Sequence, residues 1–328
     1  MTTYKGINGF AVQSVASDPS PLNEGQVWYN NATYAFKLAS VTTAGTWASG
    51  GNLNVAHYET AGAGTQTAAL CFGGNTPPNT GATEKYDGTA WTSNPTGLNT
   101  ARRELAGAGL QTAALAFGGY VTSSQSASES WNGSTWTNTP SLNTARHGLA
   151  GAGIQTSALG FGGYAPSGGG YSGITESWNG TAWTSKSGMN QNRASLAGVG
   201  ASNTSSLAFG GDTGTVKTAV TESWNGTSWT ALNSMNTARR GLAGAGSQTL
   251  ALAFGGNIPP KTSATELWNG TSWTTNPNGL GTARYGLAGA GTQTAGLGFG
   301  GYTQPGFSTA TEEFTGPGAP VTKTITTS

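Results

Sequence analysis

The chain is poor in charge, cysteine and histidine. It holds 14 Lys plus Arg and 13 Asp plus Glu in 328 residues, so 8% are charged and the net charge is +1. A typical soluble domain is about 25% charged. Without a basic patch to neutralise phosphates, we predict no nucleic-acid partner. The single cysteine, Cys71, excludes an internal disulfide framework, and two histidines leave little material for a metal centre. We expect no cofactor.

Long hydrophobic runs are also missing. No apolar stretch approaches the roughly 18 residues that a membrane-spanning helix needs. The N-terminal sequence MTTYKGINGFAVQSVASDPS lacks the apolar core of a secretory signal peptide. We therefore expect neither membrane insertion nor a secretory leader.

Glycine is abundant instead, with 54 residues, and it recurs with a period. The tripeptide FGG is repeated at spacings of 45, 44, 48, 45 and 45 residues. Each unit holds four strand-sized pieces, for example Gly241–Gly246, Leu250–Gly256, Glu222–Trp224 and Thr227–Thr230. A period of about 20–50 residues indicates a repeat architecture. The six copies begin at Phe72, Phe117, Phe161, Phe209, Phe254 and Phe299.

Turn chemistry favours an antiparallel order of the four pieces. Asn-Gly or Asp-Gly dipeptides, which favour tight hairpins, stand between the third and fourth pieces. No segment has a 3.6-residue apolar period long enough for a helix. We therefore predict an all-β fold, a six-bladed β-propeller with four-stranded antiparallel blades. The dipeptides begin at Asp87, Asn132, Asn179, Asn225 and Asn269.

The two ends of the repeat region predict how the ring closes. The last unit reaches a third strand at Glu312–Gly316 and then lacks a fourth strand with its tryptophan. Trp47 stands before Leu53 at the spacing found between the fourth strand and the next unit elsewhere. We predict that the Trp47 strand completes the last blade, which removes two exposed strand edges. The propeller then spans 45–316, and 317–328 form a C-terminal tail.

The repeat resembles the kelch family. The shared features are the double glycine after the second strand, the aromatic residue in the third strand and a tryptophan five to six residues later. They recur across about 270 residues. The resemblance implies a propeller fold more than a function, because kelch propellers include binding platforms and a few enzymes.

The N-terminal residues resemble a different class of protein. Asn23–Leu38, NEGQVWYNNATYAFKL, predicts a β-hairpin with strands Gln26–Tyr29 and Thr33–Leu38 and a turn at Asn30-Asn31. With its Pro-rich lead, it is similar to short modules of bacteriophage tail-fibre and appendage proteins. The glycine-rich repeats also resemble proteins of marine phages. Residues 1–44 are then a virion-attachment segment, and the alternative is an extra strand pair packed on the propeller.

Eleven charged residues recur at fixed repeat positions. One interpretation is a ring of arginines at the channel mouth that holds an anionic sugar. We favour a structural contact, Glu–Arg or Glu–backbone, repeated in every blade, because a half-buried carboxylate needs a donor and arginine supplies a planar one. We call this set the repeat latch. It comprises Glu84, Glu129, Glu176, Glu222, Glu266 and Glu312 with Arg102, Arg146, Arg193, Arg239 and Arg284, and His57 replaces arginine in the first unit.

Ten of the eleven tryptophans also occupy repeat positions. They predict packing between neighbouring blades, and exposed platforms for stacking sugars are the alternative. The GLAGAG pieces carry small side chains and are expected to line a narrow channel at the axis.

The stretches that follow FGG differ from unit to unit. In an up-and-down blade they emerge on the same face as the connections between blades. Loops on a rigid scaffold commonly carry recognition, and tyrosine is favoured at interfaces. The alternative is that these loops are neutral connectors. The candidate recognition residues are Tyr120, Tyr164, Tyr171, Ile258, Lys261, Tyr302 and Phe307.

Catalysis is not expected. His57 and His147 stand in no pattern typical of a Ser–His–Asp or Cys–His site. A glycosidase needs two carboxylates in one pocket, and Glu59 and Glu104 share a repeat offset near the expected channel entrance. Glycoside hydrolysis is therefore the least favoured function. The ligands of a kelch-type copper oxidase are not assembled.

The resemblances imply a phage virion protein, a tail fibre or appendage whose variable loops recognise the host cell surface. The expected partners are tail, baseplate or capsid proteins through 1–44, and a host glycan or protein; homo-oligomerisation stays open. The alternatives are a virion decoration or baseplate component without a ligand, and a cellular kelch-like interaction protein.

Overall fold

The computed structural model describes residues 12–20, 26–41, 44–318 and 320–325. The described chain consists of β-strands and loops, with one short 3-10 turn at Pro166–Gly168. It divides into two compact units, Thr46–Thr315 and the chain on either side of it. In these residues no helix has the length and apolar character needed to cross a membrane.

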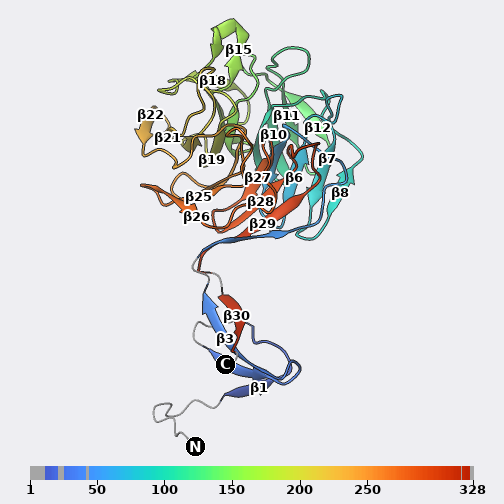
Figure 1. The fold of residues 1–328 in the computed structure, drawn as a ribbon. Helices are drawn as coiled ribbons and strands as arrows, with labels where there is room; N and C mark the ends of the chain where they lie inside the picture. The colour runs from blue at the N-terminus through green and yellow to red at the C-terminus, as the bar shows by residue number, and fades with distance from the viewer. Residues whose placement is uncertain (1–11, 21–25, 42–43, 319, 326–328) are drawn as a thin grey trace, which may run out of the picture. The chain divides into compact units, whose positions relative to one another are not determined.

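The unit Thr46–Thr315 holds a four-stranded antiparallel sheet for each FGG copy, which confirms the predicted all-β class and is consistent with a β-propeller (Figure 1). The first strands are β5 (Ala61–Gly64), β9 (Ala106–Leu110), β13 (Ala150–Ile154), β19 (Ala197–Ser202), β23 (Ala243–Gly246) and β27 (Ala288–Gly291). The second strands are β6 (Ala69–Phe72), β10 (Ala113–Phe117), β14 (Ser157–Phe161), β20 (Ser205–Phe209), β24 (Ala251–Phe254) and β28 (Ala295–Phe299).

The third and fourth strands carry the repeat aromatic residues. The third strands are β7 (Thr83–Tyr86), β11 (Ser128–Trp131), β17 (Thr175–Trp178), β21 (Thr221–Trp224), β25 (Thr265–Trp268) and β29 (Thr311–Thr315). The fourth strands are β8 (Trp91–Asn94), β12 (Trp136–Thr139), β18 (Trp183–Lys186), β22 (Trp229–Leu232), β26 (Trp273–Asn276) and β4 (Thr46–Ser49).

Each second strand ends at the phenylalanine of FGG. The two glycines that follow have positive φ, for example 65° at Gly255 and 111° at Gly256. Glycine adopts this backbone readily, whereas a Cβ disfavours it. The strand predicted at Leu250–Gly256 is therefore shorter, Ala251–Phe254.

The strand that contains Trp47 completes the last sheet, as predicted. β4 pairs antiparallel with β29, and Trp47 stands opposite Phe314. Since β4 precedes the first repeat and β29 belongs to the last, this pairing joins the two ends of the repeat region.

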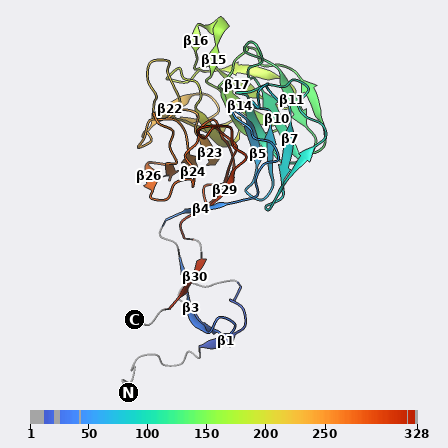
Figure 2. The same cartoon turned by 45° about the vertical axis from the view of Figure 1, so that its right-hand side comes forward.

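The first strands follow one another around a common centre. β5 contacts β9, and each next first strand contacts its successor until β27 contacts β5. In Figure 2, β5 and β23 lie toward the middle of the sheets, while β22 and β26 lie at the margin. Glycines and small residues of all six first strands line a narrow space of about 100 Å³. Small side chains are required here because the neighbouring backbones approach closely.

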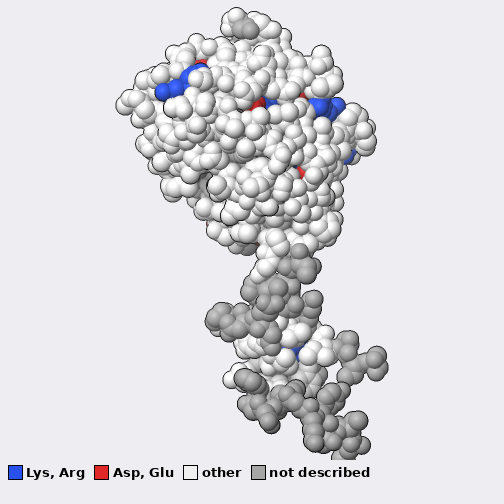
Figure 3. Space-filling model, turned by 90° about the vertical axis from the view of Figure 1, so that its left-hand side faces the viewer, with Lys and Arg blue, Asp and Glu red and all other residues white. Residues whose placement is uncertain are grey.

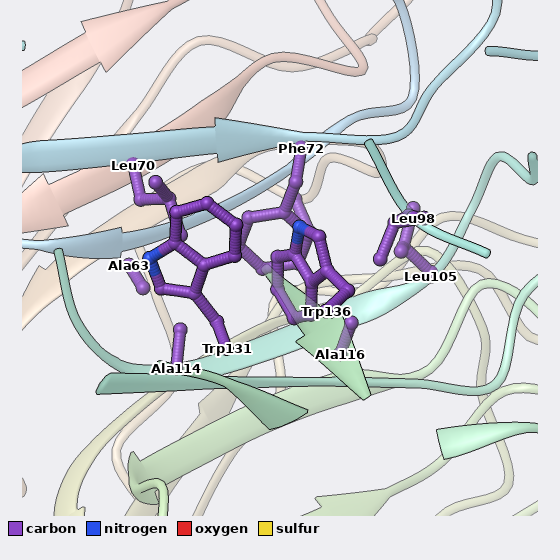
Figure 4. Packing of buried hydrophobic residues seen from close by; sticks show 10 residues of the cluster. Ala63, Leu70, Phe72, Leu98, Leu105, Ala114, Ala116, Trp131 and Trp136 are labelled. Carbon is purple, nitrogen blue, oxygen red and sulfur yellow. The ribbon is translucent and has the colours of Figure 1, made fainter. Parts of the chain in front are cut away.

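Aromatic packing joins each sheet to the next. Phe72 of one sheet lies 4.9 Å from Trp136 of the following sheet, measured between ring centroids (Figure 4). The Trp136 indole donates a hydrogen bond to Thr83 Oγ1 at 2.9 Å, again in the preceding sheet. The same ring contact recurs around the unit, so these tryptophans pack between sheets. The other pairs are Phe117–Trp183, Phe161–Trp229, Phe209–Trp273, Phe254–Trp47 and Phe299–Trp91.

The turns between the first and second strands also join neighbouring sheets. Gln111 Nε2 donates to the carbonyl oxygens of Ala69 and Tyr86 in the preceding sheet, at 3.1 and 2.5 Å. Gln66 makes the same contacts with the last sheet, at Gly296 and Phe314. The turn glutamines are thus a second link between sheets, and sequence analysis did not identify it.

The other unit is a small mixed sheet. β2 (Val27–Asn30) and β3 (Ala35–Val41) form the predicted hairpin, although its turn covers residues 31–34 and not Asn30-Asn31. β1 (Gln13–Val15) runs parallel to β2, and β30 (Pro320–Thr324) of the C-terminal tail pairs with β3.

A buried tryptophan organises this sheet. The Trp28 side chain is fully buried, and its indole donates to Asp18 Oδ1 at 3.0 Å. Pro21 and Asn23–Gly25 of the predicted attachment segment lie outside the described residues, as do 1–11 and 42–43.

Candidate functional site

The repeat glutamates and arginines lie side by side in every sheet. Each glutamate is on a third strand, and its partner stands just before the first strand of the same sheet. The five arginine side chains and His57 are fully buried. The nitrogen–oxygen distances are 3.4 Å for His57–Glu84, 2.5 Å for Arg102–Glu129, 3.2 Å for Arg146–Glu176, 3.3 Å for Arg193–Glu222, 2.6 Å for Arg239–Glu266 and 3.0 Å for Arg284–Glu312.

Backbone groups complete these contacts. Glu176 Oε2 accepts a hydrogen bond from the Asn143 N–H at 2.7 Å, and Arg146 donates to the carbonyls of Gly160 and Ile174. Burial lowers the pKa of Arg146 to about 10, and Glu176 opposes that shift. Because the arginines of the repeat latch are buried and paired, their side chains hold the blade together and are not presented to a ligand.

A ring of backbone hydrogen bonds runs through the residues two positions after the latch arginines and His57. Each N–H donates to the carbonyl of the equivalent residue in the preceding unit, and the cycle returns to its start. The N···O distances are 2.8 Å for Glu59–Gly286, 2.9 Å for Glu104–Glu59, 2.9 Å for Gly148–Glu104, 2.7 Å for Ser195–Gly148, 2.8 Å for Gly241–Ser195 and 2.7 Å for Gly286–Gly241.

All six residues of this ring have a left-handed backbone, with φ between 52° and 63°. Three of them are glycines, and the other three are Glu59, Glu104 and Ser195. A side chain in this region costs about 1–2 kcal/mol relative to the right-handed region. Polar side chains at positions that favour glycine are a feature of functional sites. The ring is therefore a candidate site.

The ring residues and, except for Arg103, the residues just before them line a cavity of about 310 Å³. The variable loops begin beside it, because the residue after FGG pairs in a β-bridge with the residue after the latch arginine, as in Arg103↔Tyr120. The cavity thus opens among the loops that differ between repeats. Its lining includes Tyr58, Glu59, Glu104, His147, Tyr164, Tyr171, Ser195, Arg240 and Tyr285.

Glu59 and Glu104 flank one arginine. Arg103 Nε lies 3.4 Å from Glu59 Oε2 and 3.9 Å from Glu104 Oε1. Burial raises the pKa of Glu59 to about 7, and the nearby Glu104 carboxylate raises it as well. Burial also raises the pKa of Glu104, against the attraction of Arg103. Near neutral pH Glu59 is therefore partly protonated, so the pair offers both a proton donor and acceptor oxygens.

His147 connects the carboxylates to the aromatic residues. Its Nε2 lies 3.9 Å from Glu104 Oε2, and its Nδ1 lies 2.9 Å from Ser124 Oγ. Burial and the charge of Arg103 lower the pKa of His147, so the ring is neutral at neutral pH. Its ring lies 5.1 Å from Tyr120 and 5.3 Å from Tyr164.

Two predicted recognition residues line the cavity from an inserted hairpin. β15 (Tyr164–Ala165) and β16 (Gly170–Tyr171) arise from the unit whose FGG spacing is 48 residues, the longest of the six. The rings of Tyr164 and Tyr171 are perpendicular, with centroids 5.4 Å apart. The extra residues of this unit thus build one wall of the cavity.

Two further predicted residues belong to an aromatic cluster where the first and last repeats meet. Phe307 stacks on Tyr58 at 5.4 Å, and Tyr302 lies 5.8 Å from the same ring. Tyr285 contacts Tyr58 edge-on at 5.5 Å. Tyr58 and Tyr285 line the cavity, so Tyr302 and Phe307 support it from behind.

The remaining candidates are not among the cavity-lining residues of the described chain. Tyr120 lies under the guanidinium of Arg103, which is 5.2 Å from the ring centroid. Lys261 forms a β-bridge with Asn257 in its own loop, and Ile258 follows Asn257 in the chain.

Sequence analysis missed the residue directly after the latch arginine. Tyr58, Arg103, Arg240 and Tyr285 occupy this position, and Arg240 pairs with Asp212 at 3.0 Å. The available signal was variation: this position differs between units while its neighbour is constant. Of the residues at this position only His147 was considered, and it was considered for catalysis and not as part of a cavity.

No protein-family model matches the chain, and no curated protein matches it significantly. Within the described part of the chain, no group of three His, Cys, Asp or Glu side chains is arranged to hold a metal ion. The functional assignment therefore depends on the geometry of the cavity.

Proposed function

We propose that residues 46–315 form a closed six-bladed, kelch-like β-propeller that serves as a recognition head. Three independent cycles support closure: the backbone ring through Glu59 and Gly286, the contacts of the first strands, and the turn amides, which are glutamine in five units and Asn203 in the other. Each cycle links the last repeat to the first. A closed ring fixes the loop ends rigidly, which suits recognition.

The observation that carries the proposal is the lining of the cavity. The scaffold residues of each repeat are nearly constant, whereas the cavity lining combines a leucine position that is also nearly constant with positions that differ, such as Tyr58, His147 and Arg240. Aromatic rings and a few convergent polar groups in a concave site are typical of ligand binding. The proposed ligand is a glycan or protein on a host cell surface.

The resemblance of the N-terminal residues extends this proposal to a bacteriophage virion, in a tail fibre or appendage. The small sheet that contains β2 and β3 then attaches the protein to the particle. Weak binding by one head gains strength from many copies. Detection of the protein in purified particles by mass spectrometry tests this part, and its absence from them would contradict it.

The recognition face is tested with labelled full-length protein, clustered on beads and incubated with a panel of bacteria. The variant Tyr164→Ala/Tyr171→Ala removes one cavity wall. Tyr34→Ala makes the same chemical change at a tyrosine of the other unit that is 81% exposed. We expect the first variant to lose cell binding and the second to keep it. Absence of binding to every strain, or equal binding by all three proteins, overturns the proposed function in favour of a structural virion component.

A further inference from the structure

We infer that the cavity binds the end of an uncharged saccharide, with its hydroxyl groups on the Glu59–Glu104 pair and its sugar faces against the tyrosines. This inference rests on the proposed recognition function and specifies its ligand class.

Charge balance favours an uncharged ligand. Arg103 lies within 4 Å of both Glu59 and Glu104, and Arg240 is paired with Asp212 at 3.0 Å. The charged side chains at the cavity therefore already have partners of opposite sign. A strongly anionic or cationic ligand would have to displace one of these partners, whereas a neutral polyol keeps them in place. On the face drawn in Figure 3, few charged side chains reach the surface.

Hydrogen-bonding capacity fits hydroxyl groups. A hydroxyl both donates and accepts, and it is best matched by a site that does the same. The Glu59–Glu104 pair holds acceptor oxygens and, when Glu59 is protonated, a donor; Ser195 adds a hydroxyl of its own. These three side chains project from the backbone ring, which fixes where they start.

At the glycines of the ring, neighbouring side chains pack directly against the backbone. A Cβ placed on Gly148 would lie 3.2 Å from Glu104 Oε2 and 3.5 Å from Ser195 Oγ. A ligand atom at the position of this Cβ, above Gly148, would therefore be close to both oxygen atoms. A Cβ on Gly286 would lie 2.4 Å from the aromatic ring of Tyr58 and collide with it. The Tyr58 side chain therefore packs against the backbone ring at Gly286. The polar side chains of Glu104 and Ser195 and the aromatic side chain of Tyr58 thus belong to the same small cavity.

The aromatic walls flank these polar side chains from two sides. Tyr164 and Tyr171 stand on the inserted hairpin, and Tyr58 and Tyr285 stand where the first and last repeats meet. Tyrosine offers an apolar ring face together with a polar tip, which matches the C–H face and the hydroxyl rim of a sugar. The volume of about 310 Å³ is at the lower end of the roughly 300–1,000 Å³ typical of small-molecule sites. It therefore admits a short saccharide end.

The test is an array of immobilised oligosaccharides probed with bead-clustered full-length protein. The neutral probes are oligomers of glucose, galactose, mannose and N-acetylglucosamine, and the charged probes are uronic-acid and glucosamine oligomers at equal density. The test variant is Glu59→Gln/Glu104→Gln. The control is Asp87→Asn, a carboxyl-to-amide change in a turn where four other repeats carry asparagine. Circular dichroism verifies the fold of both.

We expect wild type and the Asp87→Asn control to bind at least one neutral oligomer, with the double variant weakened roughly tenfold or more. Binding to charged oligomers alone, or full binding by the double variant, overturns the inference. Cell binding that survives periodate oxidation of surface sugars but not protease treatment also overturns it, and it leaves the proposed recognition function intact with a protein receptor. Failure to bind any cell, or cell binding that Tyr164→Ala/Tyr171→Ala leaves unchanged, removes both.

Discussion

The N–H of Glu59 donates a hydrogen bond to the carbonyl oxygen of Gly286 at 2.8 Å. This single contact joins the first repeat to the last and completes the backbone ring at the cavity. Because β4 also pairs with β29, the first and last repeats are joined both at the axis and at the outer edge of the sheet. In the proposed closed ring every sheet has two neighbours, so the loss of one sheet would expose the faces of two others.

Removal of β4 is expected to destabilise the whole ring. Trp47 packs 4.9 Å from Phe254 and 5.1 Å from Phe314, and its indole donates to Thr265 Oγ1 at 2.9 Å. We predict that a chain of residues 46–315 unfolds cooperatively, whereas a chain of residues 51–315 is less stable by about 3 kcal/mol or more, the cost of deleting a packed aromatic residue. Urea denaturation followed by tryptophan fluorescence measures both. Identical midpoints would show that β4 is dispensable.

Breaking a buried ion pair is expected to lower the free energy of unfolding much more than breaking an exposed one. Glu176→Gln leaves Arg146 buried without a counter-charge, and breaking such a pair costs about 3–5 kcal/mol. Asp212→Asn removes the partner of Arg240, which is 45% exposed, and costs about 0–1 kcal/mol. Both substitutions conserve shape, so the free energies of unfolding from urea titrations compare directly. A small loss for Glu176→Gln would assign the stability of the blade to the backbone contacts.

The strands of each repeat could be predicted because every unit contains its own turn and strand signals. The FGG glycines, the Asn-Gly turns and the paired tryptophans indicate four strands, and a four-stranded antiparallel sheet accompanies each copy of FGG. The role of Trp47 followed from a missing fourth strand at the other end. β30 was not predicted, because its pairing with β3 joins chain segments about 280 residues apart and leaves no local pattern.

The site was only partly predictable, for a related reason. Glu59 and Glu104 were noticed as a pair because they share a repeat offset, and Tyr164 and Tyr171 because they are tyrosines in the variable stretch after FGG. The positive φ at Glu59, Glu104 and Ser195 was not predicted, although the glycines at the same offset in three other repeats, Gly148, Gly241 and Gly286, were the available signal. The positions of these three side chains depend on the complete ring of backbone hydrogen bonds, which joins all six repeats.

Close approach of the first strands makes their glycines sensitive to a single methyl group. A Cβ on Gly151 would lie 2.6 Å from the Gly107 carbonyl oxygen and 2.8 Å from the Phe117 ring. We predict that Gly151→Ala destabilises the protein by about 1–3 kcal/mol through overpacking. Gly306→Ala, in a loop where a Cβ meets nothing within 4 Å, is expected to change stability by less than about 0.5 kcal/mol. Thermal unfolding distinguishes them, and equal stability would mean that the strands move apart easily.

Stability is expected to fall as the pH rises through the titration of Glu59. The pKa of this carboxyl is raised from 4.5 to about 7, so the folded state binds more protons than the unfolded state between these values. Its protonation therefore stabilises the fold at low pH, and this contribution, about 1–3 kcal/mol, is lost as the pH approaches 7. The variant Glu59→Gln lacks it. Urea titrations at pH 4.5 to 7.5 should show a steeper decline for wild type than for Glu59→Gln, and parallel curves would contradict the assignment.

Glu104 is expected to lower stability while it enables binding. Its backbone has φ 52°, where a side chain costs about 1–2 kcal/mol, and its carboxyl is mostly buried. Glu104→Gly relieves both costs, so we predict a gain of about 1 kcal/mol in the free energy of unfolding together with loss of saccharide binding. The reverse change at the equivalent residue, Gly148→Ala, should cost a similar amount because it introduces a side chain at φ 61°. If Glu104→Gly is instead destabilising, the contacts of Glu104 with Arg103 and His147 hold the cavity together and its role is structural.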